Sequence, residues 1–70
     1  MKCFELWRHN CWSDVAIMPI KIRHIPAKKG YWVRCNWYNI VNPKNIHDVG
    51  VVDKIFIKDV DMKNWVPYES

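Results

Sequence analysis

Residues 15–41 read VAIMPIKIRHIPAKKGYWVRCNWYNIV, and they decide the fold because they hold two β patterns joined by a short turn. Val, Ile and aromatic side chains, which favour strands, dominate both halves. We expect one strand over residues 15–25 and a second over residues 31–41. Residues 26–30 suit a tight hairpin between them, since Gly30 can take a positive φ.

The first of these strands changes its apolar face part-way along. Val15 and Ile17 share one parity, whereas Ile20 and Ile22 share the other. Pro19 lies between the two pairs, and proline inside a strand pattern marks a bulge or an edge. One extra residue at this point would return both pairs to the same face and bend the strand.

The register of the hairpin follows from matching the apolar residues of its two strands. Side chains directly opposite across a ladder lie on the same face, and a shift by one residue would mix the two faces. Pairing Ile25 with Gly30 beside the turn sets this register, and on the apolar face the expected pairs are then Ile22 with Val33, and Ile20 with Cys35. On the opposite face they are Arg23 with Trp32, and Lys21 with Arg34.

Shorter elements are expected outside the hairpin. The expected strands are residues 2–8, 51–58 and 66–68, with a polar loop over residues 42–50. Asp61 can cap one helical turn that runs through Met62 to Trp65. The sequence therefore predicts an all-β fold, with four to five antiparallel strands and one short helical turn near the C-terminus.

This order of elements resembles that of small SH3-like barrels, in architecture only, and implies a closed barrel. The aromatic signature and acidic first loop of proline-binding SH3 domains are absent, so their peptide ligands are not implied. An open four-stranded sheet is the competing fold. The expected core residues are Phe4, Leu6, Ile20, Ile22, Val33, Cys35, Trp37, Ile55 and Ile57, with Trp65 closing the barrel. The positions of Trp7 and Trp12 are undecided: one could cap an end of the barrel and the other could lie on the surface.

Length and composition predict a single domain over residues 1–70 that binds anions. The chain is 50% hydrophobic and carries a formal net charge of +4, which favours anionic partners. Three cysteines at irregular spacing do not suit a disulfide framework, and the N-terminal residues lack the apolar run of a signal peptide. A cytoplasmic protein without a membrane segment is expected.

No constellation predicts catalysis, so we expect a protein that is not an enzyme and needs no cofactor or metal. Cys3, Cys11 and Cys35 do not have the paired spacing of zinc ligands. His9 beside Cys11 lacks a third group that would orient the base. The two glycines cannot build a phosphate loop.

The favoured function is a binding module that recognises an anionic partner, a nucleic acid or a nucleotide. Lys21 opposite Arg34 is unfavourable by itself, and its retention beside an outward Trp suggests that an anion normally neutralises it, unless a carboxylate such as Glu5 does so. The expected binding residues are Lys21, Arg23, Lys28, Lys29, Trp32, Arg34, Asn36 and Tyr38. The alternatives are a small inhibitor or adaptor, of the kind phages and mobile elements encode, docking on an acidic protein, and a homodimer through the same face.

Overall fold

The computed structural model describes residues 1–69 and contains one five-stranded antiparallel sheet, which confirms the prediction of an all-β domain. The strands are β1 (Trp7–His9), β2 (Val15–Ile25), β3 (Gly30–Asn39), β4 (His47–Lys58) and β5 (Trp65–Pro67). A 3₁₀ turn, η1 (Pro26–Lys28), joins β2 to β3, and one short helix, α1 (Asp59–Met62), follows β4. Within residues 1–69, no helix has the length and apolar character needed to cross a membrane.

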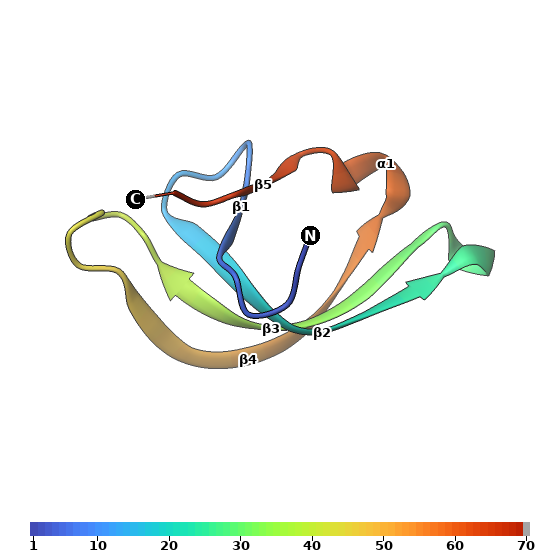
Figure 1. The fold of residues 1–70 in the computed structure, drawn as a ribbon, viewed down its shortest axis with the longest axis horizontal. Coiled ribbons are helices and arrows are strands. Elements are labelled where there is room, and N and C mark those ends of the chain that lie inside the picture. The colour runs from blue at the N-terminus through green and yellow to red at the C-terminus, as the bar shows by residue number, and fades with distance from the viewer. Residues whose placement is uncertain (70) are drawn as a thin grey trace.

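The sheet is strongly curved but is not closed into a barrel. Its strand order is β4-β3-β2-β1-β5, so β4 and β5 remain its two edges. In Figure 1, β1, β5 and α1 lie on the concave side of the curved β2–β3–β4 sheet. The ladder is interrupted between Pro19 and Lys21 of β2, and between Asn36 and Tyr38 of β3. Bulges of this kind bend a sheet, and the first confirms the irregularity predicted at Pro19.

The turn between β2 and β3 differs from the expectation in its backbone. Lys29 takes the left-handed conformation, with φ 53 and ψ 50, and Gly30 does not. Gly30 is needed for a different reason, because Phe56 and Ile57 of β4 pass directly over it. A Cβ atom at Gly30 would lie 2.5 Å from Cζ of Phe56 and 2.7 Å from the carbonyl oxygen of Ile57.

The hairpin register is confirmed except at Ile20. Ile25 pairs with Gly30 and Ile22 with Val33, as predicted. Beyond the bulge the partner of Cys35 is Pro19, so Ile20 has no partner across the ladder. Ile20 is 36% exposed whereas Pro19 is buried, and the predicted Ile20–Cys35 core pair is therefore wrong. Pro19 therefore occupies the position opposite Cys35 that the strand pattern assigns to Ile20.

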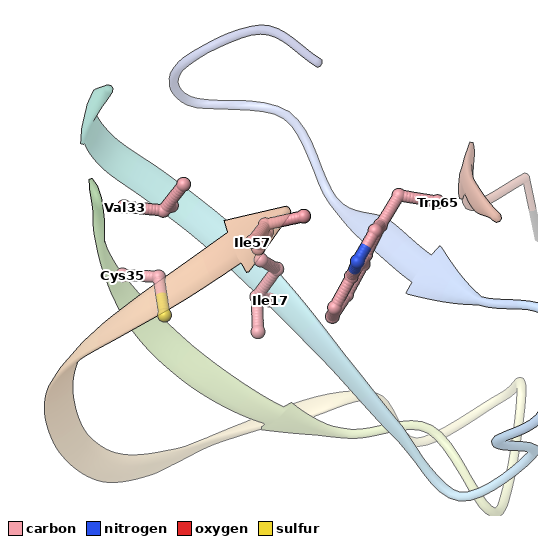
Figure 2. Close-up of a cluster of buried hydrophobic side chains, with 5 residues drawn as sticks. All are labelled: Ile17, Val33, Cys35, Ile57 and Trp65. Carbon is pink, nitrogen blue, oxygen red and sulfur yellow. The ribbon is translucent and has the colours of Figure 1, made fainter. Parts of the chain in front are cut away.

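The core lies between the concave face of the sheet and the C-terminal segment. Figure 2 shows its five buried side chains: Ile17, Val33, Cys35, Ile57 and Trp65. They come from β2, β3, β4 and β5, so the small core joins the C-terminal strand to the three long strands. The burial predicted for Val33, Cys35, Ile57 and Trp65 is confirmed. The predicted core residues that are half-buried against this cluster are Ile22, Trp37 and Ile55.

The N-terminal segment is a turn where a strand was expected over residues 2–8. Only Trp7–His9 pair in the sheet, and Phe4 has a φ of 65, which ends any extended run. The Phe4 N–H donates to the carbonyl oxygen of Pro19 at 2.8 Å, so this turn docks on the bulge of β2. Phe4 is 71% exposed and Leu6 is half-buried, so neither of these predicted core residues lies in the core.

The remaining differences concern where elements begin. β4 starts at His47, so the loop predicted over residues 42–50 is shorter. Gly50, with φ 81, lets residues 49–51 of β4 bulge opposite Trp37 of β3. Helix α1 begins at Asp59, directly after β4, and Asp61 lies inside it where a cap was predicted.

Candidate anion-binding site

The candidate site lies on the outer face of β2–β3–β4, which is the convex side of the sheet in Figure 1. Strand side chains alternate between faces, so Trp32 and Arg34 point away from the core that contains Val33 and Cys35. Arg34 is exposed and Trp32 is half-buried. The prediction that Trp32 lies opposite the core is therefore confirmed.

Two rows of side chains cross the three strands on this face. The first, called here the cationic row, consists of Lys21, Arg34 and Lys54, which are direct neighbours across the ladder. The second consists of Arg23, Trp32 and Phe56. Adjacent strands lie about 4.8 Å apart, so each row spans roughly 10 Å.

The two rows enclose an open groove of about 230 Å³, called here the basic groove. Its lining consists of Lys21, Arg23, Trp32, Arg34 and Lys54. Four of these five residues carry a positive charge, and no carboxylate of residues 1–69 belongs to the lining. The groove therefore concentrates four of the chain's 11 Lys and Arg residues around one small volume.

No neighbouring carboxylate of the described chain neutralises this charge. The ion pairs found within residues 1–69 join His9 to Asp61 and His24 to Asp59, and neither reaches the groove. Glu5 is exposed in the N-terminal turn and does not line the groove. Like charges directly opposite each other destabilise a sheet, so the cationic row costs stability unless an anion is bound.

The acidic neighbour of Lys54 faces the other side of the sheet. Asp53 lies opposite Cys35, and its carboxylate accepts a hydrogen bond from Nε1 of Trp37 at 3.3 Å. Burial raises the pKa of the Cys35 thiol to about 11, and the negative charge of Asp53 adds to this effect. The thiol is therefore a protonated core group at neutral pH.

Trp32 makes cation–π contacts with two lysines at the groove. Nζ of Lys54 lies 4.9 Å from the centroid of the Trp32 ring, and Nζ of Lys28 lies 5.9 Å from it. Exposed cation–π contacts of this kind contribute about 0.5–1 kcal/mol each. The ring of Phe56 packs against Trp32 with centroids 5.2 Å apart, and Phe56 in turn covers Gly30. The sequence had paired Trp32 with Arg23, which is opposite in the ladder, but the cation–π partners are the two lysines.

Most of the predicted binding residues are brought together, and some are not. Lys21, Arg23, Trp32 and Arg34 line the groove, and Lys28 reaches it through its contact with Trp32. The predicted residues outside the groove lining are Lys29, Asn36 and Tyr38. Lys29 is exposed at the hairpin tip, where its carbonyl oxygen accepts the N–H of Asp59 at 2.9 Å. The other two lie farther along β3.

Sequence reasoning missed one residue of the groove lining, Lys54, and the ring that packs against Trp32, Phe56. Lys54 and Phe56 alternate with Ile55 and Ile57, so their outward orientation was readable from the pattern. Their position beside Arg34 and Trp32 depends on the β3–β4 register, which the loop of residues 40–46 and a bulge separate from any local signal. Only the folded ladder shows that Lys54 completes the cationic row.

The Cys and His residues do not form a second site in the described chain. Nδ1 of His9 accepts a hydrogen bond from the backbone N–H of Cys11 at 3.1 Å, so the imidazole contacts the backbone of Cys11 and not its thiol. Its Nε2–H then donates to Asp61 at 3.0 Å. Hydrogen bonds from Asn64 and then from His9 lower the pKa of Asp61 below its usual value. Within residues 1–69, no three His, Cys, Asp or Glu side chains come together as a possible metal site.

No protein-family model, curated protein or solved structure matches this chain. These comparisons therefore assign no function, and the basic groove is described by its chemistry. That chemistry is four cations, one aromatic wall and a small open volume.

Proposed function

We propose that this protein is a non-catalytic binding module that takes a phosphate-bearing ligand, a nucleic acid or a nucleotide, in the basic groove. The observation that carries the proposal is the cationic row, in which three adjacent strands each contribute a cation at the same level of the sheet. A bound phosphate would remove the repulsion among Lys21, Arg34 and Lys54. The row therefore costs stability in the free protein and favours the complex.

The side chains of the groove suit phosphate in particular. Arg23 and Arg34 each present a planar guanidinium that can donate two parallel hydrogen bonds to phosphate oxygens. Lys21 and Lys54 add compact charges that need no fixed geometry. Trp32 supplies an apolar wall that excludes water from one side of the groove.

The fold and setting that go with this function are also proposals. Four strands, one helical turn and a short last strand are similar in order to SH3-like barrels, and we propose that this sheet is an opened form of that architecture. We propose the cytoplasm as its location, because nucleic acids and nucleotides are present there and thiols stay reduced. Cys3, Cys11 and Cys35 all have free thiols.

Fluorescence anisotropy with a labelled single-stranded oligonucleotide tests the proposed function. Three or four phosphate contacts predict that log K falls with log salt at a slope of about −2 to −3. Lys54→Glu should weaken binding at least tenfold. The matched control is Lys44→Glu, the same charge reversal in the loop between β3 and β4, outside the groove lining.

The proposal is wrong if neither oligonucleotides nor nucleotides bind at low salt, or if Lys44→Glu weakens binding as much as Lys54→Glu. A pulldown from lysate with and without nuclease adds an independent check. A protein partner that survives nuclease and depends on Lys54, with no phosphate ligand bound, would instead identify an acidic protein as the ligand.

A further inference from the structure

We propose that the basic groove recognises a clustered oligophosphate group, such as a diphosphate or triphosphate, in preference to the separated phosphodiesters of a nucleic-acid backbone. This inference rests on the proposed function and narrows its ligand class. The chemistry is shared by free nucleoside triphosphates and by the 5′-triphosphate end of an RNA strand.

The first observation is the amount of charge around one small volume. Four cations face about 230 Å³, and residues 1–69 contribute no carboxylate to the lining. A phosphodiester carries one negative charge, whereas a terminal phosphate alone carries about −1.5 to −2. Adjacent phosphates of a triphosphate share a bridging oxygen, but those of a backbone are separated by a whole sugar. Only the clustered group brings enough charge into the groove at once.

The second observation is that the cations surround a volume and do not continue along the face away from the hairpin turn. Lys21 and Arg23 approach from β2, Arg34 from β3, and Lys54 from β4. On the side away from the turn, the next level of the outer face has no charge, because it consists of Met18, Asn36 and Val52, whereas the level nearer the turn contains Lys58. Val52 is 55% exposed there. A strand of nucleic acid that runs along the face past the cationic row would leave the positive surface there, but a compact group would not.

The third observation concerns the aromatic wall. Lys54 and Lys28 both lie over the Trp32 ring, and Phe56 packs at an angle of 59° to it. A base stacked on the indole would have to displace these lysines. In the structure Trp32 positions lysines for the anion, so the base contributes little to recognition.

Isothermal titration calorimetry in the presence of EDTA tests this inference with five probes: inorganic tripolyphosphate, ATP, AMP, and one short RNA carrying either a 5′-triphosphate or a 5′-hydroxyl. Tripolyphosphate, ATP and the 5′-triphosphate RNA should each bind at least tenfold more tightly than AMP and the 5′-hydroxyl RNA. Arg34→Gln and Arg23→Gln should each reduce this binding at least tenfold. Lys44→Gln should leave it unchanged.

The outcomes separate the inference from the proposed function. If the 5′-hydroxyl RNA binds as tightly as the 5′-triphosphate RNA, the preference for clustered phosphates is wrong and nucleic-acid binding stands. If no probe binds, both proposals fail. If the triphosphate probes bind equally well to the Arg→Gln variants, folded by circular dichroism, the ligand lies elsewhere on the protein. ATP binding more tightly than the RNA end would indicate a free nucleotide, and the reverse order an RNA terminus.

Discussion

The two faces of β3 have opposite roles, although their residues alternate along one strand. On the inner face, Val33 and Cys35 are completely buried and join the core. On the outer face, Trp32 and Arg34 border a groove whose charges repel one another. The inner face stabilises the fold by burial of apolar surface, whereas the outer face costs stability and provides charge. Stability and binding should therefore respond to different substitutions on neighbouring residues.

The largest expected effect comes from the inner side of β2. Ile17→Ala removes a completely buried side chain from the core and should lower the free energy of unfolding by about 2–5 kcal/mol. The matched control is Ile20→Ala in the same strand, where the bulge leaves the side chain 36% exposed. This control should cost no more than about 1 kcal/mol. Urea unfolding of both variants is the measurement, and equal losses would contradict the observed position of the bulge.

Charge reversal on the outer face should separate binding from stability. Lys21→Glu and Arg34→Glu each replace a repulsion in the cationic row with an attraction, so unfolding free energy should stay equal or rise slightly. Ligand binding should fall tenfold or more, which corresponds to about 1.4 kcal/mol. Trp32→Ala should also lose binding without unfolding. Anisotropy and urea unfolding on the same samples measure both quantities.

Two results would contradict these separate roles of the two faces. If all three variants fold and bind as the parent does, the outer face is not the binding site. If they unfold, the face contributes to stability in a way that the repulsion among its cations does not explain.

Alkaline pH should lower stability through Cys35 on the inner face. Because burial raises the pKa of Cys35 from 9.0 to about 11, the folded state keeps a proton that the unfolded state loses. The contribution of the protonated Cys35 thiol to the free energy of unfolding is fully present below pH 9.0. It is lost as the pH rises through the folded pKa near 11. Cys35→Ala should flatten the fall in stability over this range, measured by urea unfolding. Cys11→Ser, at an exposed thiol, should leave both folding and this slope unchanged.

The smallest expected effect lies at Asp61, away from both faces of β3. Its pKa is lowered from 3.8 in the folded state, by Asn64 first and then by His9. The stabilisation is therefore present above pH 3.8 and is lost as the pH falls through the lower folded value. Asp61→Asn should reduce the loss of stability between neutral pH and about pH 3, seen by thermal unfolding. If the stability of Asp61→Asn falls with acid as much as that of the parent, this carboxylate does not contribute to the acid sensitivity of the fold.

The local sequence pattern was sufficient to predict strand pairing where the paired strands are close in the chain. The β2–β3 hairpin has a short turn, so the apolar residues of its two strands have one matching register, and Lys21, Arg23, Trp32 and Arg34 follow from it. The pattern was insufficient at residues 2–8, where alternation suggested a strand. There the left-handed Phe4 and its hydrogen bond to Pro19 form a turn that depends on the bulge of a later strand.

The sequence by itself determined the all-β class, the hairpin register, the bulge at Pro19 and which residues of β3 face outward. These follow from side-chain alternation and from turn chemistry, which act over a few residues. The tertiary structure decided that Pro19 is buried and Ile20 is not, that Trp65 packs on Ile17, and that the sheet stays open. It also decided that Lys54 completes the cationic row, because β4 reaches β3 through a bulged, long-range pairing. Contacts between distant segments form only when the whole core is assembled, so no local pattern contains them.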